Sequence, residues 1–190
     1  MNITTLHIKG MVCPRCIMAV EGVLSKLKID YINVILGEIH LVNPLDEEQE
    51  KKLEAELVTL GFEILSSRKS QLIEKIKNAV IQMVHHQNNP EKIGRLSDQL
   101  PIIIGQSYSS LSTLFSELEG QTIEKYLILQ KIEKVKELLI YEELNISEIA
   151  YKLNYSSSQH LSRQFKDITG MTPSSFKKAK HVSRRSLNDF

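Results

Sequence analysis

Several residue types are scarce in this sequence of 190 residues. It contains no tryptophan, two cysteines and five prolines. Its longest apolar runs, such as Ile102–Ile104, are far shorter than the roughly 20 residues that a helix needs to cross a bilayer, so neither a membrane span nor a membrane partner is expected. The chain also opens without the basic and then apolar pattern of a secretory signal. Two cysteines without a leader favour the reducing cytoplasm, where they are more often metal ligands or redox groups than a structural disulfide.

The near-neutral total charge hides an uneven distribution. The formal net charge of the chain is +1, but residues 1–70 carry −2, residues 71–150 carry −3 and residues 151–190 carry +6. A basic end on an otherwise acidic chain is expected where that end contacts a polyanion. Charge alone leaves a second interpretation open, in which the end is a solvated and disordered basic tail.

The first 66 residues alternate short strand and helix patterns. Thr4–Lys9 alternates polar and apolar residues, and the strand-like segments Tyr31–Leu36 and Ile39–Val42 are joined at Gly37-Glu38, which suits a tight hairpin. Apolar residues at helical spacing predict one helix after the cysteines and a second one capped by Asp46. With a last short strand at 62–65, the order is βαββαβ, a ferredoxin-like arrangement.

Cys13 and Cys16 are separated by two residues, where the first predicted strand gives way to the first predicted helix. Two thiolates at this spacing can face one side of a loop and bind a soft metal ion such as Cu(I) or Zn(II). The helix N-terminus and Arg15 both favour the thiolate over the thiol. The spacing alone leaves two alternatives open, namely a dithiol redox pair and two half-buried cysteines without a ligand. A thioredoxin-type pair is disfavoured, because Pro44 precedes a helix instead of facing the dithiol.

The loop Gly10-Met11-Val12-Cys13-Pro14-Arg15-Cys16 resembles that of the heavy-metal-associated domains of copper chaperones and metal-pumping ATPases. The resemblance covers residues 3–66 and implies that Cys13 and Cys16 are metal ligands, with Cu(I) favoured over Zn(II). It also implies that Met11 is an apolar prop beneath the loop. The Pro14-Arg15 pair departs from the small or polar pair more usual in that family. Two thiolates leave a tetrahedral site incomplete, so a second molecule, a small thiol or a two-coordinate metal would have to complete the coordination.

The histidines are predicted to be poorer ligands. His7 alternates away from Leu6 and Ile8, so we expect it on the surface. His85 and His86 point about 100° apart on a helix and cannot share one face. We therefore expect this pair at a solvated helix end.

The second half of the chain reads as helices and repeats itself. After a linker helix predicted over residues 67–90, six residues of one segment recur 50 positions later. Leu111, Ser112, Phe115, Gly120, Thr122 and Tyr126 correspond to Leu161, Ser162, Phe165, Gly170, Thr172 and Phe176. Upstream the offset is 49, where Gly105 corresponds to Asn154 and Ser107 to Ser156, so the second copy is one residue longer at its turn. Two tandem helix-turn-helix units explain this repeat, and residues 122–141 predict a connecting helix about 30 Å long.

The segment Ile146–Lys166, followed by Thr169–Pro173, resembles the second helix-turn-helix signature of the AraC-type transcription regulators. The match covers residues 95–178, and Lys131–Leu139 resembles the connecting helix of that family. It implies a double-stranded DNA partner, a promoter or an operator. Ala150 permits close helix crossing, and a small core is predicted from Ile149, Leu153, Leu161 and Phe165. The candidate DNA-contacting residues of this unit are Ser157, Ser158, Gln159, His160, Arg163 and Lys166, because such side chains can bond base edges or phosphates.

The first copy predicts a weaker contact with DNA. Pro101 stands where the second copy has Ala150, which is tolerable only if the helix begins at Asp98 and Pro101 falls in its first turn. The recognition helix predicted over residues 107–119 has no Lys or Arg and carries Glu117 and Glu119, which phosphates repel. The candidate contacts here are the neutral side chains of Ser107, Tyr108 and Ser110. We expect the second unit to dominate salt-dependent affinity.

These observations predict an α+β chain in four parts. They are a ferredoxin-like sensor domain of the heavy-metal-associated type over residues 1–66, a linker helix over 67–90, an all-α AraC-type DNA-binding domain over 91–180 and a mobile basic tail over 181–190. The predicted function is a cytoplasmic, sequence-specific transcription regulator that responds to a thiophilic metal. The linker helix would carry the coupling, through its packing or as the contact of a homodimer.

Two other functions remain open for this sequence. The N-terminal domain could be a metal-independent dimerisation or partner module, and the chain could instead be a metal-delivery protein. An enzyme is not expected, because the sequence shows no Ser/His/Asp set, no paired-carboxylate site and no phosphate-binding loop.

Overall fold

Helix α3 (Arg68–Ile81) contains the boundary between the two compact units of the chain, Met1–Asn78 and Ala79–Phe190. The structure is a computed structural model that describes residues 4–86, 95–141, 144–179 and 187. Each unit is described by itself below.

The first unit is built around a sheet of four strands. Its elements are β1 (Thr4–Lys9), α1 (Pro14–Leu27), β2 (Tyr31–Ile35), β3 (Glu38–Leu41), α2 (Glu47–Thr59), β4 (Glu63–Ile64) and most of α3. The strands pair antiparallel in the order β2-β3-β1-β4. The order of elements before α3 confirms the predicted βαββαβ arrangement.

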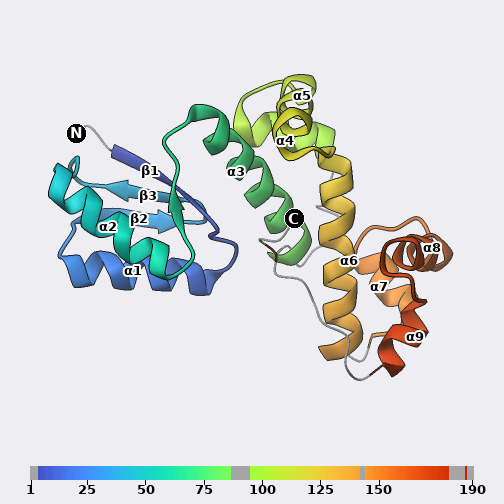
Figure 1. Cartoon of the computed structure of the whole chain (residues 1–190). Coiled ribbons are helices and arrows are strands. Elements are labelled where there is room, and N and C mark those ends of the chain that lie inside the picture. Colours follow the sequence, from blue (N-terminus) through green and yellow to red (C-terminus); the bar gives the residue numbers. More distant parts are fainter. Residues whose placement is uncertain (1–3, 87–94, 142–143, 180–186, 188–190) are drawn as a thin grey trace. The chain divides into compact units, whose positions relative to one another are not determined.

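Helices α1 and α2 lie side by side on one face of this sheet (Figure 1). Because side chains alternate along a strand, Ile8 of β1 and Ile39 and Leu41 of β3 point into the core that the two helices close. Leu24 and Leu53 meet them from α1 and α2. The strand residues between these positions therefore face the opposite side of the sheet.

Local sequence explains how α2 begins. Asp46 accepts a hydrogen bond from the backbone N–H of Gln49 at 2.7 Å, and the Gln49 side chain accepts one from the backbone N–H of Asp46 at 3.2 Å. Glu47, Glu48 and Glu50 follow in the first turn, where negative charge is favourable. The predicted cap is confirmed.

The second unit is all-helical. After the end of α3 come a π-helical turn (Gln82–His86), α4 (Leu96–Ile104), α5 (Tyr108–Glu119), α6 (Ile123–Tyr141), α7 (Ile146–Lys152), α8 (Ser158–Thr169) and α9 (Pro173–Lys178). Helices α4 and α5 form the first helix-turn-helix unit, α7 and α8 form the second, and α6 connects them (Figure 1). This confirms the predicted fold class, and α6 ends at the predicted residue.

The core of the second helix-turn-helix unit is the one expected from the sequence. Ile149, Leu153, Leu161 and Phe165 are all buried in one cluster with residues of α6. Phe165 packs edge-to-face against Phe176 of α9, with ring centroids 5.4 Å apart. This contact ties α8 to the helix that follows it.

The two turns differ by one residue, as predicted, although the alignment after the turn needs a correction. Gly105 at φ 77° and Asn154 at φ 54° end the first helix of each unit in the left-handed region. One residue then separates Gly105 from Ser107, the N-cap of α5, whereas two separate Asn154 from Ser157, the N-cap of α8. Ser107 therefore corresponds to Ser157 and not to Ser156, because the extra residue precedes the cap.

The expected position of Pro101 is also wrong. Helix α4 begins at Leu96 instead of Asp98, so Pro101 lies inside the helix and cannot donate to the carbonyl group of Ser97. The longer helix is held at its start, because the backbone N–H groups of Asp98 and Gln99 both bond to the Arg95 carbonyl oxygen. Leu96 and Leu100 are buried, and their burial offsets the missing bond.

Each of the four predicted segments has residues that lie outside the described ones. They are residues 1–3 of the sensor domain, 87–90 of the linker helix, 91–94, 142–143 and 180 of the DNA-binding domain and, apart from Leu187, the basic tail 181–190. Among the residues that the structure describes, no helix is both long and apolar enough to cross a membrane.

Candidate nucleic-acid interface and thiol loop

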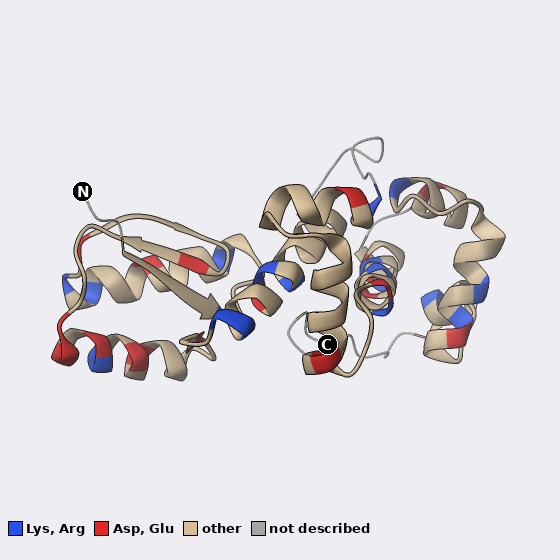
Figure 2. Cartoon of the chain, turned by 90° about the horizontal axis from the view of Figure 1, so that it is seen from above, with Lys and Arg blue, Asp and Glu red and all other residues tan. Residues whose placement is uncertain are grey.

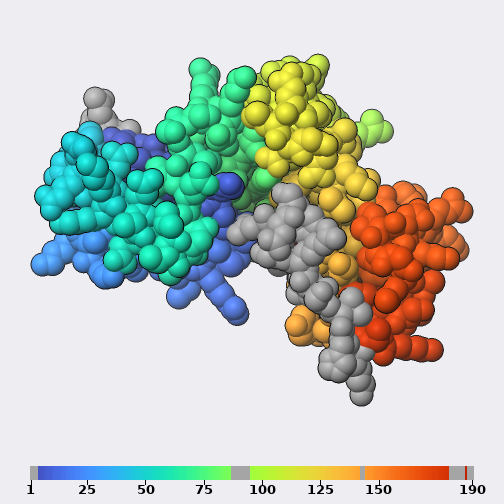
Figure 3. Space-filling view, viewed as in Figure 1, coloured from blue at the N-terminus to red at the C-terminus, as the bar shows by residue number. Residues whose placement is uncertain are grey.

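Helix α8 presents most of the predicted DNA-contacting residues at the surface. Its N-cap, Ser157, accepts a hydrogen bond from the backbone N–H of His160 at 3.1 Å. Gln159, His160, Arg163 and Lys166 are exposed, while Ser158 is half-buried and its hydroxyl contacts the side chain of Gln159. Lys and Arg residues recur along α8 and α9 (Figure 2). Helices α7 to α9, orange to red, form part of the outer surface on the face shown in Figure 3.

Tyr155 fixes the start of α8 to the rest of its unit. Its hydroxyl donates to the side-chain oxygen of Gln164 at 2.7 Å, and its ring lies edge-on to His160 with centroids 5.5 Å apart. The Lys131 ammonium group lies 5.0 Å from the centre of the same ring, and Ser156 contacts Nδ1 of His160 at 3.1 Å. Burial raises the pKa of Tyr155, which keeps the hydroxyl a neutral donor. These contacts orient His160, which is one of the predicted DNA-contacting residues.

The first helix-turn-helix unit has a different surface. Ser107 caps α5 by accepting from the backbone N–H of Ser110 at 3.3 Å, and both serines are exposed. The Tyr108 hydroxyl donates to the carboxylate of Glu124 on α6, so this side chain joins two helices. Burial and this carboxylate raise the pKa of Tyr108. With Ile102 84% exposed and no cation on α5, the unit offers little to attract phosphate groups.

The loop between β1 and α1 brings the two cysteines together. The sulfur atoms of Cys13 and Cys16 lie 3.5 Å apart, and Cys16 Sγ is 4.0 Å from the carbonyl oxygen of Gly10. Both cysteines are half-buried, and Pro14 begins the helix that follows. Met11 is fully buried in the core below, as the resemblance implied. The loop therefore holds two accessible thiols at a common point on the surface.

The two thiols differ in acidity. Burial acts to raise the pKa of Cys13, but the backbone N–H groups of Cys16 and Arg15 and the Arg15 charge outweigh it, so this pKa is lowered. Burial raises the pKa of Cys16, and the neighbouring Cys13 sulfur adds to that effect. Cys13, at the N-terminus of α1, is therefore the group that ionises first.

The cysteine pair by itself provides an incomplete metal site. Within the described ranges, no group of three or more His, Cys, Asp or Glu side chains gathers where a metal ion could bind. The sulfur separation is close to the roughly 3.8 Å that two tetrahedral Zn–S bonds of about 2.3 Å would give. A linear two-coordinate ion would need the sulfur atoms farther apart. The residues thus fit a soft metal that takes its remaining ligands from elsewhere.

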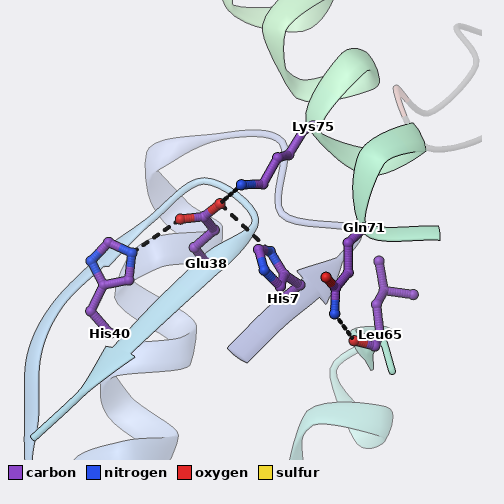
Figure 4. A network of polar contacts seen from close by, with 6 residues as sticks. All are labelled: His7, Glu38, His40, Leu65, Gln71 and Lys75. Carbon is purple, nitrogen blue, oxygen red and sulfur yellow. Dashed lines mark hydrogen bonds and ion pairs between the residues drawn. The ribbon is translucent and has the colours of Figure 1, made fainter. Parts of the chain in front are cut away.

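A polar network that sequence reasoning missed lies on the sheet face opposite α1 and α2 (Figure 4). The Glu38 carboxylate lies 3.5 Å from Nδ1 of His7, 3.0 Å from Nε2 of His40 and 2.8 Å from Nζ of Lys75 on α3. His7 is half-buried, which corrects its expected surface position, and burial lowers its pKa. Burial acts to raise the pKa of Glu38, but its hydrogen bonds with Lys75 and His40 outweigh that effect, so this pKa is lowered.

The expectation for the other histidines also needs a correction. Nε2 of His85 contacts the side-chain oxygen of Gln130 at 3.1 Å, and neither His85 nor His86 is exposed. Burial, together with the charge of Lys134, lowers the pKa of His85 to about 4. The pair therefore does not form a solvated helix end, because α6 packs against this turn.

Comparisons with known proteins identify relatives of the all-helical second unit. The sequence model of a family described as a helix-turn-helix domain matches residues 103–179. The xylose operon regulatory protein of Escherichia coli (strain K12) is 31% identical over 137 residues, which are 72% of this chain and 35% of that protein. The C-terminal part of the chain is an AraC-family helix-turn-helix domain.

One further relative and one solved structure show how far the likeness of the C-terminal domain extends. The F1 operon positive regulatory protein of Yersinia pestis is 33% identical over 100 residues, 53% of this chain and 33% of that protein. The C-terminal domain of AraT, a response regulator from Geobacillus stearothermophilus, has the same fold, with a TM-score of 0.51 and 22% identity over 63% of this chain and 94% of that one. The chain spans about a third of the length of the xylose operon and F1 operon regulatory proteins. The AraC family is not enzymatic. For this domain, the expectation that the chain is not an enzyme is therefore confirmed.

Proposed function

We propose that the chain is a sequence-specific DNA-binding transcription regulator whose second helix-turn-helix unit reads the DNA. The observation that carries the proposal is the exposed face of α8, where Gln159, His160, Arg163 and Lys166 project from a capped helix. Gln and Arg side chains can form paired hydrogen bonds with base edges, whereas Lys suits phosphate oxygens. The names of the curated relatives, which are operon regulators, support the same function.

Selection of bound DNA from a random pool with the full chain tests this proposal. An enriched sequence motif is expected, and fluorescence anisotropy at fixed salt then gives its affinity relative to scrambled DNA. Arg163→Ala should lower specific affinity by about 5- to 150-fold, since a bidentate base contact is worth about 1–3 kcal/mol. The matched control is Thr113→Ala, because Thr113 occupies the same position on α5. Failure to enrich any motif would contradict the proposal.

The second part of the proposal concerns the thiol loop. Cys13 and Cys16 bind a thiophilic metal ion of the Cu(I) or Zn(II) class, and the bound metal alters the affinity of the chain for DNA. Support comes from the 3.5 Å separation of the sulfur atoms, from the lowered pKa of Cys13 and from the heavy-metal-associated type of loop between β1 and α1. A metal at this place would act as a Lewis acid held by soft ligands.

Metal titration of the reduced chain tests the second part. Near-ultraviolet thiolate–metal absorbance should saturate with Cu(I), and the Cys13→Ser and Cys16→Ser variants should lose it. The DNA affinity of the wild type should change with metal, and that of the variants should not. Specific DNA binding that ignores metal would favour a metal-independent dimerisation or partner module, and metal binding without specific DNA binding would favour a metal-delivery protein.

A further inference from the structure

Gly10 lies between the thiol loop and helix α3. Its backbone N–H donates to Oε1 of Glu74 on α3 at 3.0 Å, and its carbonyl oxygen is 4.0 Å from the sulfur of Cys16. The two groups belong to the peptide units on either side of one Cα atom. Gly10 is buried and has φ 94°, a conformation that L side chains rarely adopt. The carbonyl oxygen near the Cys16 sulfur and the N–H that bonds to Glu74 are therefore separated by one Cα atom. A movement at the sulfur can reach α3 through Gly10 alone.

Glu74 is the α3 residue that receives this contact. It is only 8% exposed, and a buried carboxylate is costly unless hydrogen-bond donors surround it. The N–H of Gly10 is one donor to this carboxylate, so a movement of that N–H acts directly on Glu74. Two other α3 side chains hold the same stretch of helix. Gln71 donates to the carbonyl oxygen of Leu65 at 2.9 Å, and Lys75 pairs with Glu38 at 2.8 Å (Figure 4).

We propose that the Glu74–Gly10 hydrogen bond couples the state of the two thiols to helix α3. The inference rests on the proposed metal binding and names the route by which it acts. When a metal ion replaces the thiol proton of Cys16, the sulfur no longer donates to the carbonyl oxygen of Gly10. The peptide on that side turns, the backbone of Gly10 shifts with it, and the N–H of Gly10 moves relative to Glu74 and its turn of α3. Glu74 is a positioning residue in this scheme and is not a metal ligand.

Helix α3 is suited to carry such a change. It is one continuous helix from Arg68 to Ile81, and it contains the boundary at Asn78 between the two compact units. Linkage is reciprocal, so a contact that transmits metal binding must also affect metal affinity. Couplings of this kind change affinity by about 5- to 150-fold. The loss of Glu74 should therefore be visible in the DNA affinity and in the metal affinity.

The test measures hydrogen exchange along α3 before and after the thiols of the full reduced chain are occupied. Two probes are used, Zn(II) and phenylarsine oxide, which bridges a pair of thiols whether or not the site has a natural metal. In the wild type, both should change the exchange rates of α3 amides severalfold. Glu74→Ala should abolish that change, and Glu74→Gln, which keeps an acceptor oxygen, should retain most of it. The matched control Gln71→Ala removes a neighbouring anchor and should leave the change intact.

The outcomes separate this inference from the proposed function. A response of α3 in Glu74→Ala equal to that of the wild type would overturn the coupling role of Glu74. An absence of any α3 response in the wild type to either probe would also overturn it. A response to phenylarsine oxide without one to Zn(II) would support the coupling and contradict Zn(II) as the bound metal. If Glu74→Ala does not fold, the α3 responses of Glu74→Gln and Gln71→Ala are compared instead. A loss of the hydrogen-exchange response in Gln71→Ala alone contradicts the coupling role of Glu74.

Discussion

Ser107 and Ser157 occupy the same position in the two helix-turn-helix units. Each accepts a hydrogen bond from the backbone N–H three residues later, at 3.3 Å from Ser110 and 3.1 Å from His160. Both helices that follow have 12 residues and end at a glycine in the left-handed region. The backbone therefore repeats with an offset of 50, so residues at matching positions of α5 and α8 can be exchanged in pairs.

The first prediction uses such a pair, Thr113 on α5 and Arg163 on α8, which are both exposed. Arg163→Thr should weaken binding to the selected DNA by about 5- to 150-fold, because a base or phosphate contact is lost. Thr113→Arg should add a cation near the phosphates and strengthen binding to any sequence. Anisotropy titrations at several salt concentrations measure both effects. If Thr113→Arg has no effect on affinity or its salt dependence, α5 does not approach DNA.

Lys166 gives a second prediction about the same interface. Its side chain is exposed on α8, one turn after Arg163. Lys166→Ala should reduce affinity about equally for selected and scrambled DNA and lower the slope of log K against log salt by about 1, since one fewer counterion is released. A loss confined to the selected sequence would instead assign Lys166 to base recognition. The same titrations distinguish the two outcomes.

Pro101 gives a prediction about stability. Because it lies inside α4, Pro101→Ala restores a backbone N–H that can bond to the carbonyl group of Ser97. A proline in a helix interior costs about 3 kcal/mol relative to alanine, and its stiffening of the unfolded chain returns up to about 1 kcal/mol. We expect the free energy of unfolding to rise by about 2–3 kcal/mol in urea denaturation. Pro173→Ala is the control and should give no gain, since Pro173 is buried at the first position of α9, where proline is favourable.

Gly37 and Gly22 form a matched pair for the first unit. Gly37 has φ 82°, and a Cβ atom there would clash with Nδ2 of the buried Asn78. Gly37→Ala should therefore lower the free energy of unfolding by about 1–3 kcal/mol. Gly22 lies inside α1 with no heavy atom within 4 Å of an added Cβ, so Gly22→Ala should raise it by about 0.5–1 kcal/mol. Equal effects of the two substitutions would contradict this account.

His85 predicts a pH dependence of stability. Its folded pKa of about 4 lies below the ordinary value of 6.5, so the unfolded chain binds more protons between these two pH values. Stability should therefore fall as the pH drops from about 6.5 to about 4, by roughly 3 kcal/mol from this group. His85→Gln removes the titrating group and should flatten the dependence over this window. Lys134→Ala removes the nearby charge, so it should raise the folded pKa of His85 and make the loss of stability smaller. Chemical denaturation at a series of pH values measures both variants.

The elements themselves were predictable because the signals for them are local. The period-two pattern of Thr4–Lys9 and the capping side chain of Asp46 each depend on residues close together in the chain. The helix-turn-helix repeat was visible because one local pattern, which includes Phe115, returns 50 positions later with Phe165. The predicted DNA-contacting face of α8 follows from the same helical period. Pro101 was misplaced because the bonds to the Arg95 carbonyl oxygen and the burial of Leu96, which lengthen α4, are not visible in the local pattern.

The βαββαβ order, the two helix-turn-helix units and the proximity of Cys13 and Cys16 follow from the sequence alone, because short-range periodicity, caps and spacing specify them. Which distant side chains meet is a property of the folded chain. Gly10 and Glu74 are 64 positions apart, and His85 and Gln130 are 45 apart. No local pattern records such pairs, because packing of whole elements brings them together and burial then sets their hydrogen bonds and pKa values.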